Sequence, residues 1–96
     1  MELTQDMALI IGDLMIFIDK NNLEKSLPKL LTVCKGFQEA CLDDSKKDDE
    51  TAKSCYRSSV DAEKYIQECI DKKVSYSTVY DRVHEYYSSS VFEQVR

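Results

Sequence analysis

Glycine and proline, the residues that most often interrupt regular secondary structure, are nearly absent from this chain. Its 96 residues include two glycines and one proline, so tight turns and long loops are not expected. Over most of the length, apolar side chains recur at intervals of three and four residues, the period of an amphipathic helix. The sequence therefore predicts an all-α fold, either a small four-helix bundle or a helical-hairpin assembly, mostly antiparallel.

Four helices are predicted, over residues 3–20, 23–42, 50–73 and 76–88, while residues 89–96 either extend the last helix or fray. Asn22 is a suitable cap for the second helix, although Pro28 also allows that helix to begin with a short turn and restart. Ser75 is a suitable cap for the fourth helix. We expect the second and third helices to form an antiparallel hairpin around residues 43–49. No linker or repeat divides the chain, so residues 1–96 are expected to form one domain.

Three of the predicted helices carry a single apolar stripe each. On the second it consists of Leu23, Leu27, Leu30, Cys34, Phe37 and Cys41, on the third of Ala52, Cys55, Ser59, Ala62, Ile66 and Cys69, and on the fourth of Tyr76, Val79, Tyr80, Val83 and Tyr87. The stripe on the third helix is made of small side chains, which allow a neighbouring helix to approach closely. The spacing on the fourth helix favours core packing. Tyrosine keeps a polar end that needs a partner, so we expect that face to be partly solvated, more like an interface than a deep core.

The four cysteines all lie on these stripes. In an antiparallel hairpin Cys41 is level with Cys55, but Cys34 faces Ala62, so two matched disulfides cannot form. No closely spaced cysteine pair of the kind that binds zinc is present. We therefore expect four buried, reduced thiols with no metal site. A single Cys41–Cys55 disulfide is the alternative.

The first helix has more apolar surface than one stripe requires. Its main stripe is Leu3, Met7, Ile10, Ile11, Leu14, Met15, Phe17 and Ile18. On the opposite, polar side lie Leu9 and Ile16, one heptad apart as in a coiled coil, with Gly12 between them. We interpret these three residues as a second contact surface, for self-association or for a partner's helix. The alternative is that this helix is central and buried on all sides.

Charge and composition exclude several classes of partner. The net charge of −5 argues against binding to nucleic acid or to an anionic membrane. The first residues, MELTQD, are acidic where a secretory signal is basic, and the apolar run over residues 7–18 is shorter than the roughly 20 residues of a membrane span. We expect an intracellular protein, cytoplasmic or nuclear, without membrane insertion.

Catalytic motifs are also absent from the sequence. The single histidine, His84, has no serine or cysteine motif beside it, and the cysteines lie on apolar stripes where a thiolate is disfavoured. We predict no catalytic residues and no cofactor. The predicted function is that of a non-enzymatic adaptor or assembly subunit binding a protein partner or itself, through Leu9, Gly12, Ile16, Tyr76, Tyr80 and Tyr87. The alternative is a small-ligand-binding or redox-responsive bundle that uses the cysteine-lined seam between the second and third helices.

Overall fold

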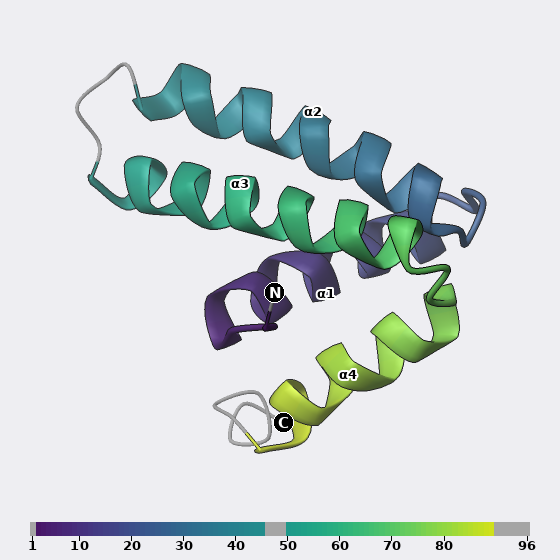
Figure 1. Ribbon diagram of the computed structural model, residues 1–96. Coiled ribbons are helices and arrows are strands. Elements are labelled where there is room, and N and C mark those ends of the chain that lie inside the picture. The colour runs from purple at the N-terminus through teal and green to yellow at the C-terminus, as the bar shows by residue number, and fades with distance from the viewer. Residues whose placement is uncertain (1, 46–49, 90–96) are drawn as a thin grey trace.

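The computed structural model describes the backbone of residues 2–45 and 50–89, and the side chains of residues 2–42, 50 and 53–86. This part of the chain forms α1 (Gln5–Lys20), α2 (Leu27–Ser45), α3 (Glu50–Asp71) and α4 (Tyr76–Ser89), with no strand among the described residues (Figure 1). The predicted all-α class is confirmed. Of the predicted tail, residues 90–96 lie outside the described residues.

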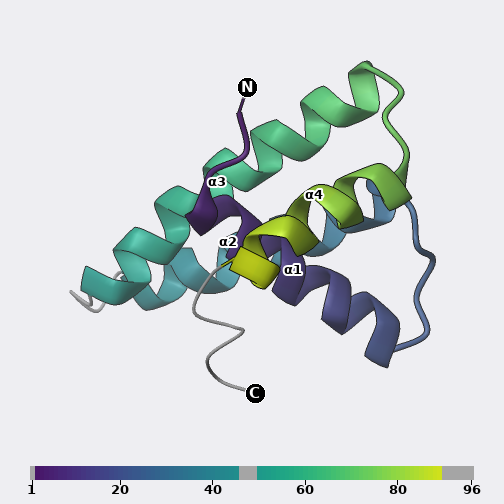
Figure 2. The ribbon, with the colours of Figure 1, turned by 90° about the horizontal axis from the view of Figure 1, so that it is seen from below.

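The helices are arranged as a hairpin with a second pair of helices packed beneath it. α2 and α3 lie side by side and run in opposite directions, and their contact is the most extensive in the molecule (Figure 1). α1 packs against α2, α3 and α4, which makes it the central helix. α4 runs back toward the start of α1 and crosses it obliquely, so that the two helices diverge toward the end of α1 and the start of α4 (Figure 2). α4 therefore packs against its own molecule.

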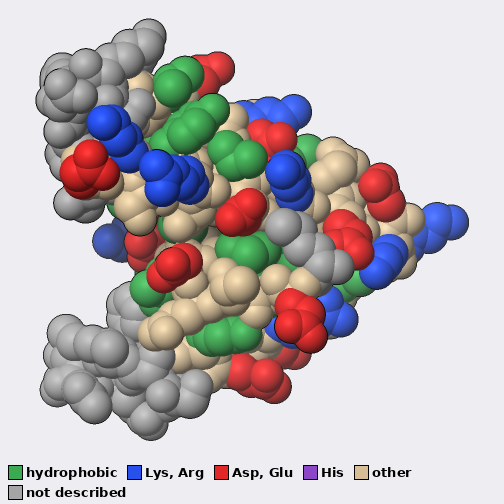
Figure 3. Space-filling view, turned by 60° about the vertical axis from the view of Figure 1, so that its left-hand side comes forward, with side chains coloured by type: hydrophobic (Ala, Val, Ile, Leu, Met, Phe, Trp, Pro, Cys, Tyr) green, Lys and Arg blue, Asp and Glu red, His purple; other side chains and the backbone are tan. Residues whose placement is uncertain are grey.

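The hydrophobic core is built around α1. Its buried members are Met7, Ala8, Ile11, Leu14, Met15 and Ile18 of α1, Leu27, Leu30 and Cys34 of α2, Ala62, Tyr65, Ile66 and Cys69 of α3, and Val79 and Val83 of α4. Every helix thus buries one face, as the periodic patterns predict. On the outer surface in Figure 3, acidic and basic side chains are interspersed, with hydrophobic side chains between them.

Side-chain contacts across the hairpin show how α2 and α3 are aligned. The Cys34 thiol donates to the carbonyl oxygen of Ser59 at 3.6 Å, and the Gln38 amide donates to the Glu63 carboxylate at 3.3 Å. Ser59 is one helical turn from Ala62, the residue expected opposite Cys34, so the predicted pairing is close to the observed one. The backbone of α3 is accessible to the thiol because the residues on this face of α3 are small.

The start of α2 differs from its expected position at Leu23. Asn22 does not cap α2, because its backbone has a positive φ of 53° and belongs to the end of α1. The helix begins instead at Leu27, where the Ser26 hydroxyl accepts a hydrogen bond from the backbone N–H of Lys29 at 3.3 Å. Pro28 lies in the first turn, where its missing N–H leaves no helical hydrogen bond unmade. The later start near this proline, one part of the alternative, is observed, but no helical turn precedes it.

α1 and α3 end in the same way. In α1 the N–H of Leu23 bonds to Ile18 O at 2.9 Å and that of Asn22 to Asp19 O at 3.2 Å. In α3 the N–H of Val74 bonds to Cys69 O at 2.9 Å and that of Lys73 to Ile70 O at 3.0 Å. Both pairs form the Schellman pattern, which requires a left-handed residue after the helix. Asn22 and Lys73, with φ values of 53° and 58°, are those residues.

Lys73→Gly is expected to stabilise the protein, because a lysine side chain is strained in the left-handed region and glycine is not. We expect the free energy of unfolding, measured by urea denaturation, to rise by about 0.5–1 kcal/mol. The matched control is Lys64→Gly on the exposed side of α3, where glycine in a helix interior should lower that free energy by a similar amount. A Lys73→Gly variant that is less stable than the wild type would contradict this account of the α3 terminus.

Several side chains on the predicted apolar stripes are more exposed than expected, Phe17 and Cys55 among them. Phe17 of α1 is 49% exposed, because it lies about 100° around the helix from the buried Ile18 and the other helices do not cover it. Cys55 of α3 is half-buried, whereas Cys34, Cys41 and Cys69 are buried as expected. The predicted stripes are therefore right in direction but too wide at their edges and ends.

Candidate functional site

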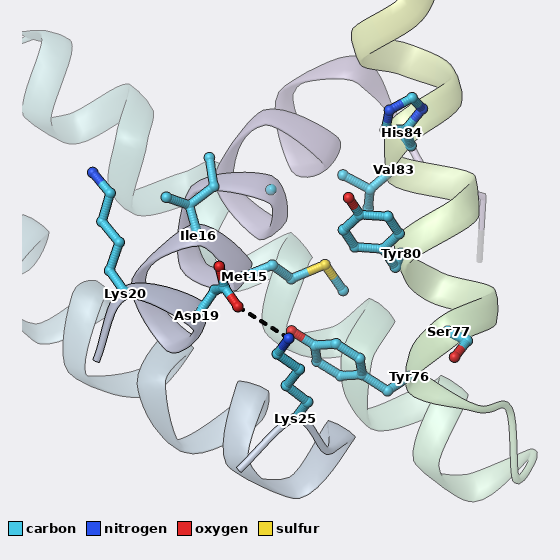
Figure 4. Close-up of a pocket in the computed structure, with 11 residues that line it drawn as sticks. Met15, Ile16, Asp19, Lys20, Lys25, Tyr76, Ser77, Tyr80, Val83 and His84 are labelled. Atoms are coloured by element: carbon cyan, nitrogen blue, oxygen red, sulfur yellow. Dashed lines mark ion pairs between the residues drawn. The ribbon is translucent and has the colours of Figure 1, made fainter. Parts of the chain in front are cut away.

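A hollow of about 610 Å³ lies between α1 and α4, at the end where α1 finishes and α4 begins (Figure 4). It is lined by Gly12, Met15, Ile16, Asp19 and Lys20 of α1, by Lys25 of the loop that follows, and by Tyr76, Ser77, Tyr80, Val83 and His84 of α4. We refer to it as the α1–α4 hollow. At the other end of the helix pair, the Tyr86 hydroxyl of α4 donates a hydrogen bond to the carbonyl oxygen of Leu3, which precedes α1.

The walls of the hollow expose apolar surface. Ile16 is 47% exposed and Tyr80 is 50% exposed, and they stand on opposite walls. Between them, Met15 and Val83 are buried and belong to the core. In Figure 4 the rings of Tyr76 and Tyr80 project from α4 toward α1. The hollow is thus a groove between two helices with a fixed apolar floor and two large apolar groups at its rim.

The end of the hollow near the α1–α2 loop is polar. Lys25 Nζ lies 3.0 Å from the Asp19 carboxylate, and both side chains are more than half exposed. The hydrogen bond and charge of Asp19 raise the pKa of Lys25. Figure 4 shows the Tyr76 hydroxyl beside this pair, and burial raises the pKa of Tyr76 while the charge of Lys25 lowers it. An exposed ion pair contributes little stability, so its effect here is to hold the loop against the end of α1.

A second set of contacts holds α4 in place on its other side. Arg82 donates a hydrogen bond from Nη1 to the Tyr65 hydroxyl at 3.1 Å, which links α4 to α3. Burial raises the pKa of Tyr65, and the guanidinium of Arg82 acts in the opposite direction. At the start of α4, the Ser75 hydroxyl accepts from the Thr78 N–H at 3.1 Å, so Ser75 is the cap that was predicted. These contacts fix the α4 wall of the hollow.

Four of the six predicted contact residues line this one hollow: Gly12, Ile16, Tyr76 and Tyr80. Leu9 is half-buried and lies outside the lining. The side chain of Tyr87 lies outside the described residues. Gly12 is buried rather than on the polar side of α1 as predicted, because α4 packs against that side of the helix. The side of α1 that was predicted to be polar is therefore buried within the molecule at Gly12 and exposed at Ile16.

Several lining residues were not identified from the sequence. Asp19, Lys20, Lys25 and His84 line the hollow but were not among the predicted contact residues. Lys25 reaches Asp19 only because the left-handed Asn22 reverses the chain after α1. No helical period links two residues on either side of such a turn, so no sequence pattern could have paired them.

The polar side chains of the hollow are not spaced as a catalytic nucleophile and its base. His84 and Ser77 are seven residues apart on α4, about 10 Å along the helix axis, which is too far for a nucleophile and its base. The ring of His84 lies beside the ring of Tyr80, with 6.0 Å between the ring centroids. Among the described residues, no three His, Cys, Asp or Glu side chains are grouped to hold a metal ion. No described helix is long and apolar enough to cross a membrane.

The cysteine-lined seam between α2 and α3 is closed to solvent at Cys34, whereas Cys55 is half-buried. All four cysteines are free thiols. Cys34 is fully buried, and burial, followed by the nearby charge of Glu63, raises the pKa of its thiol from the ordinary value of 9.0 to about 11. A thiol in this state is neutral and donates to Ser59 O. Neither a ligand nor an oxidant can reach it without the hairpin opening.

Cys34 is expected to react very slowly with a thiol reagent in the folded protein up to about pH 10, because its pKa is near 11 and only the thiolate reacts. Between pH 9.0 and about 11 the unfolded state loses this proton and the folded state does not, so the free energy of unfolding should fall as the pH rises.

Phe37→Ala, which removes a half-buried ring one turn away from Cys34, should lower the free energy of unfolding by about 3 kcal/mol and speed the labelling of Cys34. Fast labelling of Cys34 in the wild type, measured by mass spectrometry, would contradict the burial.

Comparison with known proteins adds no relative: no protein family, no curated protein and no solved structure matches this chain.

Proposed function

We propose that this protein is a non-enzymatic helical interaction module, an adaptor or assembly subunit, which binds a helix of another protein in the α1–α4 hollow. The observation that carries the proposal is the pair of half-exposed apolar residues, Ile16 and Tyr80, on opposite walls of a groove whose floor is buried. Large apolar groups at the rim of a pre-formed groove are typical of binding sites for helices. In the reducing interior of a cell the free thiols stay reduced, and the hairpin serves as a rigid support.

The dimensions of the hollow suit a helix. Its lining extends from Gly12 to Lys20 along α1 and from Tyr76 to His84 along α4, which is about 12 Å on each helix at 1.5 Å per residue. A bound helix that presents apolar side chains at positions i, i+4 and i+7 spans about 10 Å. α1 and α4 diverge at this end of the molecule, which leaves room for the side chains of a third helix between them. One partner helix would therefore cover both rim residues at once.

A ligand or redox role for the α2–α3 seam has less support. That role requires access to the thiols, whereas Cys34 is fully buried and hydrogen-bonded to Ser59 O. Of the large apolar side chains that are exposed among the described residues, Ile16, Phe17 and Tyr80 lie on α1 and α4, and Leu42 lies on α2.

Site-specific photo-crosslinking in cells of the native source tests the proposal. A photoreactive phenylalanine analogue at position 16 or position 80 should crosslink to the same partner protein. Position 17 is the matched control, because Phe17 is as exposed as Ile16 but does not line the hollow. Equal crosslinking at positions 16 and 17, or none at positions 16 and 80, would contradict the proposal.

A further inference from the structure

The charges around the α1–α4 hollow differ in sign from those of the whole chain. The lining contains two lysines, Lys20 and Lys25, against one carboxylate, Asp19, and α4 contributes no acid to it. Asp19 is already paired with Lys25 at 3.0 Å. Lys20 has no ion-pair partner among the described residues. In a chain with a net charge of −5, the hollow is therefore a local basic site next to exposed apolar surface.

We infer that the occupant of the hollow is an acidic amphipathic helix of another protein. This inference rests on the proposed function and adds the chemistry of the partner. The apolar side of that helix contacts Ile16 and Tyr80, and a Glu or Asp beside it faces Lys20. Figure 4 shows Lys20 on the α1 side, beyond Ile16, Lys25 at the loop end beside the Tyr76 hydroxyl, and the tyrosine rings on the α4 side. A helix lying in the groove thus meets Lys20 at its α1 edge, Lys25 at its loop end and aromatic rings on its α4 side.

Charge complementarity favours an acidic helix over a basic one. A basic side chain at the α1 wall would be placed against Lys20 with no free carboxylate in the lining to receive it, because Asp19 is engaged by Lys25. Like charges brought together across an interface oppose binding, and complementary charges fix the orientation of the partner. The Tyr76 hydroxyl, beside Lys25, is a further hydrogen-bond donor for a carboxylate.

The shape of the hollow argues against a second copy as the occupant. A symmetric dimer places the same surface of both molecules in contact, so two concave hollows would face each other and leave empty volume. A second copy could fill the hollow only with a different, protruding residue such as Phe17. That head-to-tail contact does not close on itself and gives open chains. A separate helix fills the hollow without either consequence.

Selection from a helical peptide library tests the inference. Each displayed peptide has apolar residues at positions i, i+4 and i+7, and the flanking positions carry Glu, Gln or Lys at equal frequency. We expect selection on the full chain to enrich Glu-flanked peptides, with affinity at least tenfold weaker for Ile16→Asp. Lys20→Glu should weaken them by about threefold to tenfold, and salt should reduce the preference for Glu. Lys35→Glu, an exposed lysine of α2 away from the hollow, is the matched control and should bind as the wild type does.

The outcomes separate the two proposals. Peptides that bind regardless of their flanking charge, but lose affinity in Ile16→Asp, would overturn the acidic partner and leave the proposed function standing. Enrichment of Lys-flanked peptides that also lose affinity in Ile16→Asp would likewise overturn the acidic partner and leave the proposed function standing. If no selected peptide is sensitive to Ile16→Asp, the hollow is not a helix-binding site and both proposals fail. Lys20→Glu and Lys35→Glu could also weaken binding equally, in peptides that Ile16→Asp no longer binds. The preference for Glu would then come from the overall charge of the protein and not from Lys20, and the inference would be overturned.

Discussion

Ile11→Asp is expected to abolish the cooperative thermal unfolding transition of this protein, measured by circular dichroism at 222 nm. Ile11 is fully buried in the central helix. Removing its aliphatic contacts costs about 2–5 kcal/mol, and placing a carboxylate among apolar side chains costs several more. The total approaches the stability of about 5–15 kcal/mol that is usual for a domain.

Ile16→Asp is the control for this experiment. It introduces the same charge on the same helix, five residues further along, at a side chain that is 47% exposed. We expect its free energy of unfolding to change by less than about 1 kcal/mol. A cooperative transition near the wild-type temperature in Ile11→Asp would show that α1 is not the central helix of the core.

The second large effect concerns binding. The double variant Ile16→Asp and Tyr80→Asp should lower the affinity for the natural partner by at least about hundredfold, measured by isothermal titration calorimetry. Both residues are half-exposed in the free protein and would become buried under the partner. Residues at the centre of an interface commonly contribute about 2 kcal/mol each, and two of them account for about a thousandfold change in affinity.

The fold of the double variant should be intact, because neither residue belongs to the core. Phe17→Asp is the control, as it removes an equally exposed apolar side chain outside the hollow. It should leave the affinity within about threefold of the wild type. If Phe17→Asp weakens binding as much as the double variant does, the contact surface is the exposed side of α1 rather than the hollow.

Much of the fold could be predicted because several sequence signals agree. The apolar period, the scarcity of glycine and proline, and the serine before α4 all indicate helices with defined ends. The small residues of α3 correctly indicated a closely packed hairpin with α2, in which Cys34 reaches the backbone of Ser59. Such local signals do not depend on the rest of the structure, so a single sequence is enough to identify them.

The errors occur where packing with other helices decides the outcome. Asn22 can cap one helix or end another in the left-handed conformation, and the structure uses it for the end of α1. Gly12 was placed on the polar side of α1 and is buried, whereas Phe17 was placed in the core and is 49% exposed. In both cases the helical wheel gives the angle of the side chain, but the position of the neighbouring helices decides its burial.

The candidate site could be predicted in part. Gly12, Ile16, Tyr76 and Tyr80 were identified from an apolar excess on two separate helices, and the fold brings them into one hollow. The basic residues Lys20 and Lys25 were not identified, because no sequence pattern distinguishes an isolated lysine at a binding site from any other surface lysine. Their meaning depends on Asp19 being paired with Lys25, which is a property of the folded loop.

The most direct test of the central claim is to map the bound partner on the protein by NMR, using the backbone amide shifts of the ¹⁵N-labelled chain as the crosslinked partner is added. The account predicts the largest shifts in residues 12–20 of α1, in Lys25 and in residues 76–84 of α4, with α2 and the outer side of α3 little changed. Shifts concentrated on the α2–α3 hairpin, with the residues of the α1–α4 hollow unaffected, would contradict it.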